Sequence, residues 1–276
     1  MSHRPGIPST GEAPRPNYRL PLLRLVQAAY YIVRGQPRDL GADFRFLMRN
    51  VPVGPLVTGV DNMPASGPFV LVANHYQRPG LWMGWAAMIA GKIIHECRGR
   101  RVRWIAISEW DDYRLAGIPV PSPATRYVFG RFYEVFGFIA MPPMRASIQE
   151  RAAAVRCAME AIASGDVIGL FPEGTVGETP ALLEAREGSG GFLLALSKQA
   201  APIIPLALYE EAGRLRVAFG PPVSLEEATT TSRSERDAVA RRLVMEAIAA
   251  MMPGELRGFY SGGTDPKAST RGVDQK

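Results

Sequence analysis

Apolar runs alternate with amphipathic stretches along most of the chain, and their periods predict strands and helices in turn. The continuous apolar runs 69–73 and 167–171 are typical of strands buried on both faces of a sheet. The other expected strands are 57–60, 103–107, 203–209 and 215–219. The expected helices are 20–33, 43–49, 81–94, 147–164, 192–199 and 234–251. Strands separated by helices predict an α/β fold, with a largely parallel central sheet flanked by helices.

The segment 147–164 carries the clearest helix signals. Ser147 and Glu150 match a capping box at its start, and Gly165 stands where a C-terminal cap is expected. The apolar stripe that should face the core consists of Ile148, Val155, Met159 and Ile162.

The distribution of polar and apolar residues divides the chain into four parts. Residues 1–19 are rich in Pro, Gly, Arg and Ser and lack the apolar core of a signal peptide, so we expect a disordered tail there. A second disordered tail is expected at 261–276. Between them we expect an N-terminal helical, membrane-proximal segment at 20–50 and a single α/β domain at 51–260. No apolar segment reaches the roughly 20 residues that a membrane-spanning helix needs.

Composition narrows the classes of partner. The 276 residues suffice for one large α/β domain, and the 47% hydrophobic and 21% charged residues are ordinary for a soluble globular protein. The net charge of +6 suits an anionic membrane surface or an acidic ligand, or it merely keeps the surface soluble. The basic and aromatic stretch 127–136 comes with no nucleic-acid motif, so apolar packing is the better account and no nucleic-acid partner is expected. The two cysteines form no spacing motif and fit reduced thiols.

One of the three histidines stands at a position suited to chemistry. His3 lies in the expected tail, and His95 lies at a helix end among charged residues. His75 differs, because it follows the strand 69–73 directly after Asn74. An imidazole titrates near neutral pH and can take a proton from an attacking hydroxyl. The alternative is a structural histidine that is hydrogen-bonded in a turn.

A second polar motif, Pro172-Glu173-Gly174-Thr175, follows the strand 167–171. Its glycine permits close backbone approach to a ligand, and its carboxylate and hydroxyl supply an acceptor and a donor. The carboxyl ends of the strands in an open α/β sheet line the ligand crevice. The two motifs are therefore expected to meet in one cleft.

Together the two motifs resemble the glycerol-phosphate and lysophosphatidate acyltransferase family. Its signature is Asn-His, four residues and Asp, followed later by Pro-Glu-Gly-Thr. The block 136–141, followed by Arg145, resembles the family's Gly-Phe-Ile block, whose arginine contacts the acceptor's phosphate. The block 201–207 resembles the Val-Pro-Ile-Val-Pro-like strand that shapes the substrate channel. The resemblance covers roughly 57–223.

The resemblance implies an αβ acyltransferase domain in which His75 is the general base. The residues it implies for substrate binding are Asn74, Arg145, Glu173, Gly174 and Thr175. No bound cofactor or metal is expected, and acyl-CoA or an acyl carrier protein would deliver the acyl group as co-substrate. The acceptor would be a hydroxyl of a glycerol-phosphate or lysophospholipid-like molecule in phospholipid biosynthesis.

The chain departs from the family pattern at Gly80, where the family has the Asp that orients the imidazole. Arg78-Pro79-Gly80 reads as a remodelled turn, so we expect another carboxylate within about 3 Å of a His75 ring nitrogen. The candidates for it are Glu173, Glu109, Asp111 and Asp112.

A second departure is Val176, which stands where the family has an arginine after Glu-Gly-Thr. A bidentate grip on phosphate is therefore missing at this position. The arginines that could replace it are Arg78, Arg145 and Arg186. The other interpretation is an acceptor that is not a glycerol phosphate.

The glycine-rich turn 188–191 opens an expected helix and could cradle a phosphate or pantetheine. It lacks the Walker and dinucleotide endings, and the chain has no Gly-x-Ser-x-Gly elbow of a serine hydrolase. We therefore expect Ser189 to cap the helix.

Two functions remain at the level of sequence. The first is acyl transfer by a cytoplasmic protein held peripherally on the inner face of the cell membrane, by its N-terminal helix, the apolar segment 81–94 and its positive charge. The alternative is a catalytically degenerate lipid-binding protein with the same fold.

Overall fold

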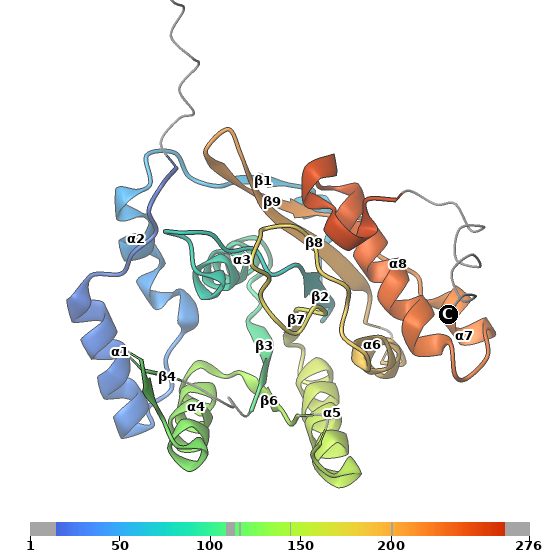
Figure 1. Cartoon of the computed structure of the whole chain (residues 1–276), viewed down its shortest axis with the longest axis horizontal. Coiled ribbons are helices and arrows are strands. Elements are labelled where there is room, and N and C mark those ends of the chain that lie inside the picture. Colours follow the sequence, from blue (N-terminus) through green and yellow to red (C-terminus); the bar gives the residue numbers. More distant parts are fainter. Residues whose placement is uncertain (1–14, 109–113, 116, 144, 200, 263–276) are drawn as a thin grey trace, which may run out of the picture.

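The central element of the molecule is a seven-stranded, mostly parallel sheet (Figure 1). The computed structural model describes residues 15–108, 114–115, 117–143, 145–199 and 201–262. The sheet has the order β1-β9-β8-β2-β7-β3-β6, and every neighbouring pair is parallel except β8 and β9. Its strands are β1 (Leu56–Thr58), β2 (Val70–Ala73), β3 (Val102–Ile107), β6 (Ile139–Met141), β7 (Val167–Leu170), β8 (Ile203–Glu211) and β9 (Arg214–Phe219). The expected α/β fold with a largely parallel sheet is confirmed.

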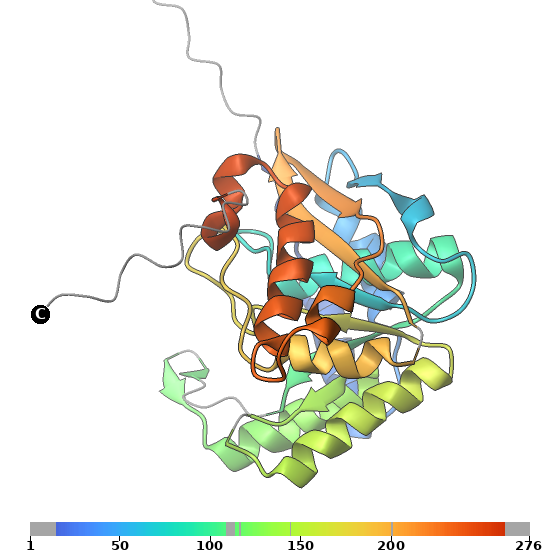
Figure 2. The ribbon, with the colours of Figure 1, turned by 90° about the vertical axis from the view of Figure 1, so that its right-hand side faces the viewer.

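Helices cover both faces of the sheet, and each face has its own core. The helices are α1 (Leu22–Arg34), α2 (Phe44–Leu47), α3 (Met83–Arg98), α4 (Ser122–Phe136), α5 (Ile148–Ala163), α6 (Ser189–Ser197), α7 (Glu226–Thr230) and α8 (Arg236–Ala250). In β2, Leu71 and Ala73 join the core beneath α3, whereas Val70 and Val72 join the core beneath α5, α6 and α8. Successive side chains of a strand point to opposite faces, which explains why this run is apolar throughout. Figure 2 shows α6 and α8 in front of the sheet.

The helix α5 confirms the capping signals and corrects the expected stripe. The Ser147 hydroxyl accepts a hydrogen bond from the Glu150 amide at 3.2 Å, and the Glu150 carboxylate accepts one from the Ser147 amide at 2.9 Å. Ile148, however, is 73% exposed. The rest of the expected stripe is confirmed, because Ile162 is buried and Val155 and Met159 pack against the same core, and Ala154, Ala158 and Ala161 complete the buried face. Small residues let the helix approach the sheet, and Ile148 lies about a quarter turn away from that face.

Several elements lacked a sequence prediction. They are the helices α4 and α7, the strand β6, and a hairpin of β4 (Arg114–Leu115) and β5 (Ile118–Pro119). In α4, Tyr133 and Phe136 are buried, as apolar packing of this stretch requires, but Tyr127 is 69% exposed.

The N-terminal region is helical and packs on the domain. Leu47 of α2 is fully buried, whereas α1 has no buried residue. Tyr18 is only 2% exposed, and its amide donates to the Gly80 carbonyl at 2.7 Å. This contact corrects the expected boundary of the N-terminal tail, because residues 15–19 lie against the domain. Residues 1–14 and 263–276 of the two expected tails lie outside the described residues. No helix in the described ranges is long and apolar enough to cross a membrane.

Candidate active site

The two motifs meet because their strands are parallel neighbours. Val70 and Val72 of β2 pair with Ile168 and Leu170 of β7, so both strands end at the same edge of the sheet. His75 follows β2 and Glu173 follows β7. The His75 Nδ1 atom lies 3.2 Å from Glu173 Oε2, within reach of a hydrogen bond. The other carboxylates considered, Glu109, Asp111 and Asp112, lie outside the described residues.

Glu173 is buried and fully engaged. Its side chain is 1% exposed. Its Oε2 atom also accepts a hydrogen bond from the His75 amide at 2.5 Å, and its Oε1 atom accepts one from the Leu183 amide at 2.9 Å. A buried carboxylate needs such partners to offset its lost hydration. Glu173 thus contacts the imidazole, as one of the carboxylates expected from sequence.

The imidazole of His75 is held on one ring nitrogen and on one face. Its ring stacks on Phe171 with centroids 4.6 Å apart, and Phe171 stacks in turn on Trp104 at 4.8 Å. The His75 side chain is 9% exposed. Donation from Nδ1–H to the Glu173 carboxylate leaves Nε2 as the unprotonated, accepting nitrogen. The arrangement can therefore supply a general base.

Asn74 is part of the scaffold. Its side chain is fully buried, and its amide group donates to the Leu208 carbonyl at 2.8 Å and accepts from the Leu208 amide at 2.7 Å. Because β8 is the parallel neighbour of β2, these two bonds extend the sheet beyond Ala73 and fix the direction in which the chain leaves it. In the structure, Asn74 therefore has an anchoring role.

The remaining expected binding residues lie at different places. Gly174 and Thr175 are exposed beside Glu173. Gly174 has a φ of +64°, which strains other residues, and a Cβ there would lie 2.9 Å from Arg186 Cδ, so the Arg186 side chain would have to shift. Arg145 is exposed after β6, and β3 separates β6 from β7 in the sheet.

The departure at Gly80 is a tight turn. Arg78 and Leu81 exchange backbone hydrogen bonds at 3.1 and 2.9 Å, with Pro79 and Gly80 between them. Gly80 has a φ of +84°, as the third position of a type II turn requires. A Cβ at Gly80 would meet Arg78 Nη1 at 2.9 Å and Asn17 Oδ1 at 3.2 Å.

Arg78 is fully used by the protein, which corrects its assignment as a phosphate ligand. Its side chain is 7% exposed and forms a two-pronged ion pair with Glu210, through Nε at 2.7 Å and through Nη2. The guanidinium also donates to the carbonyls of Pro16 and Pro79, each at 2.7 Å. Glu210 was missed from sequence, although it stands at the end of a strand parallel to β2.

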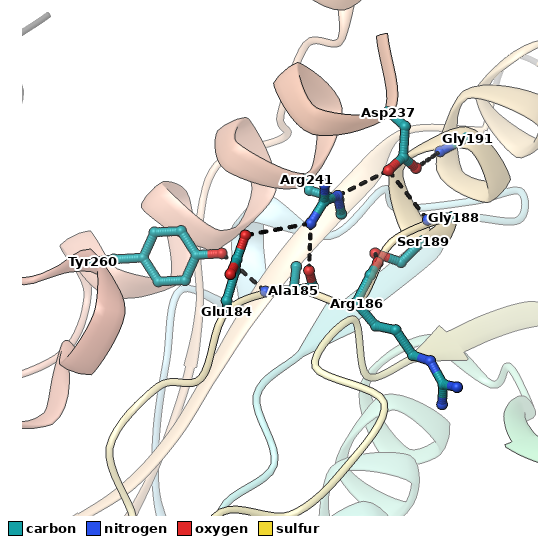
Figure 3. A network of polar contacts seen from close by, with 9 residues as sticks. All are labelled: Glu184, Ala185, Arg186, Gly188, Ser189, Gly191, Asp237, Arg241 and Tyr260. Atoms are coloured by element: carbon teal, nitrogen blue, oxygen red, sulfur yellow. Dashed lines mark hydrogen bonds and ion pairs between the residues drawn. The ribbon is translucent and has the colours of Figure 1, made fainter. Parts of the chain in front are cut away.

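The glycine-rich turn is already occupied by a carboxylate (Figure 3). Gly188, not Ser189, caps α6, and the Ser189 hydroxyl donates back to the Arg186 carbonyl at 2.7 Å. The amides of Gly188 and Gly191 donate to the carboxylate of Asp237 at 3.1 and 2.7 Å. This α8 side chain, which no sequence signal indicated, fills the position that a phosphate would take.

The comparison with models of protein families agrees with the motif resemblance. The family model described as Acyltransferase matches residues 55–209, more than half of the chain, and the match contains both motifs. Among solved structures, the chain is similar to the 1-acyl-sn-glycerophosphate (LPA) acyltransferase PlsC from Thermotoga maritima, with 17% identity, a TM-score of 0.45 and 83% of each chain covered. No curated protein matches the chain.

Proposed function

Because the chain belongs to the acyltransferase family, we propose that it is an O-acyltransferase acting in phospholipid biosynthesis. It transfers a fatty acyl group from an acyl thioester to a hydroxyl of a glycerol-phosphate or lysophospholipid-like acceptor. The observation that carries this proposal is the hydrogen-bonded pair of His75 and Glu173, 3.2 Å apart at the ends of two neighbouring strands.

In the proposed reaction His75 moves one proton. Nε2 takes the proton of the acceptor hydroxyl while the oxygen attacks the thioester carbonyl carbon. A carbon–oxygen bond forms, the carbon–sulfur bond breaks, and the leaving thiolate takes the proton from the imidazolium. The products are an ester and a free thiol. The Glu173 carboxylate holds the ring in the productive tautomer and stabilises the imidazolium, which is the role of the carboxylate in a hydrolytic triad.

The proposal also covers substrate contacts and the acyl donor. Gly174 and Thr175, which are exposed beside Glu173, contact the substrate in this proposal, and acyl-CoA or an acyl carrier protein delivers the acyl group without any bound cofactor. The described residues include no group of three or more His, Cys, Asp or Glu side chains that could hold a metal ion.

The surface of α1 suits a cytoplasmic protein that is attached to the inner face of the cell membrane. This helix carries a row of exposed apolar side chains, with exposed fractions between 45% and 78%: Leu22, Leu23, Leu25, Val26, Tyr30 and Val33. Arg34 lies in its last turn. An apolar face beside cationic residues is typical of helices that lie in an anionic lipid interface.

Release of free thiol from an acyl-CoA tests the proposal against the alternative of a lipid-binding protein that performs no reaction. The acceptors are glycerol 3-phosphate and a 1-acyl-glycerol 3-phosphate. We expect His75→Ala and Glu173→Gln each to lower the rate about a hundredfold or more, because each removes one part of the base. His95→Ala, at an exposed histidine of α3, is the control and keeps the parent rate.

Two outcomes would contradict the enzyme assignment. One is a His75→Ala protein that melts like the parent and retains its rate. The other is a parent protein that retains lipid but releases no thiol with any acceptor, as the degenerate lipid-binding alternative requires.

A further inference from the structure

The segment 182–189 is fastened to the catalytic motif along its length. The Leu183 amide donates to Glu173 Oε1 at 2.9 Å, and the Arg186 amide donates to the Pro172 carbonyl at 2.8 Å. The Arg186 carbonyl accepts from the Ser189 amide at 3.1 Å and from its hydroxyl at 2.7 Å. The backbone of this segment, and with it the point from which each of its side chains starts, is therefore fixed relative to the His75–Glu173 pair.

The charges behind this segment are mutually satisfied. Arg241 donates through Nε to Asp237 at 2.9 Å and through Nη1 to the Ala185 carbonyl at 2.6 Å, and it lies 3.7 Å from Glu184. Asp237 in turn accepts the amides at the start of α6. Figure 3 shows the Arg186 side chain extending away from this network.

Arg186 is an unpaired cation that lies beside the motif Pro172-Glu173-Gly174-Thr175. Its residue is exposed, and no hydrogen bond or ion pair joins its guanidinium to another residue of the described ranges. Its aliphatic stem fills the space that the missing side chain of Gly174 leaves open, since a Cβ there would lie 2.9 Å from Arg186 Cδ and 3.4 Å from Arg186 Cβ. Arg78 and Arg241, by contrast, are already engaged by protein groups.

We propose that Arg186 binds a phosphate group of a substrate at the His75–Glu173 site. A guanidinium presents a planar fork of donors that matches phosphate oxygens, and an arginine held by its backbone and stem loses little freedom on binding. The phosphate belongs either to the acceptor or to the nucleotide part of a coenzyme A donor. That the bound phosphate belongs to a substrate of acyl transfer rests on the proposed function, whereas phosphate binding by Arg186 itself does not.

The test compares Arg186→Gln with Arg186→Lys and with Arg233→Gln, a control at an exposed arginine between α7 and α8. Calorimetry measures binding of two probe pairs that differ in phosphate: glycerol 3-phosphate against glycerol, and coenzyme A against pantetheine. We expect Arg186→Gln to weaken one phosphate-bearing probe about tenfold or more, the usual effect of losing a charged hydrogen bond. Arg186→Lys retains part of the affinity, and Arg233→Gln retains all of it.

Kinetics identify whether Arg186 binds the phosphate of the acceptor or that of the donor. If it is the acceptor, Arg186→Gln lowers kcat/KM about tenfold for a 1-acyl-glycerol 3-phosphate and leaves the matching monoacylglycerol unchanged. If it is the donor, the loss appears with acyl-CoA and not with the S-acyl pantetheine.

The outcomes separate this inference from the proposed function. Equal binding of all four probes by parent and Arg186→Gln proteins of equal melting temperature overturns the anion site, even if thiol release is normal. A selective loss of phosphate binding in a protein that releases no thiol upholds the site and rejects the enzyme assignment.

Discussion

Glu173 links the structure of the site to its chemistry, because one carboxylate accepts the His75 amide, the Leu183 amide and the imidazole. The first two bonds hold the buried carboxylate in place, and the third lets it orient the imidazole of His75. A sequence reading identified Glu173 as one of several candidates for the partner of His75. Only the pairing of β2 with β7 decides which carboxylate of the described chain reaches the ring.

The geometry of position 80 makes a direct restoration of the family's aspartate ineffective. In Gly80→Asp the side chain starts toward Arg78 and Asn17, and a φ of +84° strains any residue with a Cβ. We expect no gain in acyl-transfer rate and a loss of roughly 1 kcal/mol or more in the free energy of unfolding. Thiol release and urea denaturation measure the two effects.

Gly67→Asp is the matched control, because Gly67 has a φ of +83° with nothing within 4 Å of its would-be Cβ. It reproduces the backbone strain without the contacts. A rise of orders of magnitude in the rate of Gly80→Asp would show instead that the site is degenerate and that Glu173 does not replace the aspartate.

At the scale of elements, the sequence is most informative where the local pattern and the final packing agree. The apolar run of β2 is buried on both faces, and the capping box of α5 is present as expected. The helix α4 was missed because aromatic and basic residues are interleaved along it, so that only part of its surface is buried. The contacts that hold the site join residues far apart in the chain, as Arg78 and Glu210 or Asn74 and Leu208 do, and no local pattern encodes them.

The segment before α1 contributes a buried tyrosine whose titration is measurable. Burial, with a smaller contribution from the charge of Glu210, raises the pKa of Tyr18 to about 12 from its ordinary value of 10.0. The folded state thus holds its proton more tightly than the unfolded state. The free energy of unfolding is therefore independent of this group below about pH 10, and it falls as the pH rises from about 10 to 12, because the buried phenolate is disfavoured.

The variant Tyr18→Phe removes this titration. The Tyr18 hydroxyl is buried without a hydrogen-bond partner in the described chain, so its removal costs no bond and the stability at pH 7 should not fall. We expect the urea midpoint of the variant to decline less steeply than that of the parent between pH 10 and 12. Tyr127→Phe, at an exposed tyrosine of α4, is the control and declines like the parent. Identical alkaline profiles for all three proteins would contradict the assignment.

At the scale of the whole molecule, the candidate active site and the apolar face of α1 belong to one packed structure. The segment that leads into α1 is joined to the turn after His75 by two hydrogen bonds. The Tyr18 amide donates to the Gly80 carbonyl, and the Arg78 guanidinium donates to the Pro16 carbonyl. In the proposed reaction, an acceptor that lies in a lipid surface would have to reach the end of β2 while its acyl chain stays in apolar surroundings. A protein that docks through α1 would meet this requirement without a membrane span.

Docking of this kind predicts binding to anionic vesicles that weakens with salt, because charge attraction is screened over about 8 Å at physiological ionic strength.

Deletion of residues 1–50 is a poor test, since it would remove the fully buried Leu47 from the core. The sharper variant replaces the exposed Leu22, Leu23 and Val26 by Ser, which leaves the buried residues intact. We expect this triple variant to bind anionic vesicles at least tenfold less tightly than the parent, because each substitution removes part of the about 1.5–3 kcal/mol that full burial of an apolar side chain contributes. Phe259→Ser removes an exposed apolar residue after α8 and should bind like the parent. Equal binding of parent and triple variant, or equal partitioning to neutral and anionic vesicles at all salt concentrations, would place the lipid contact elsewhere than α1.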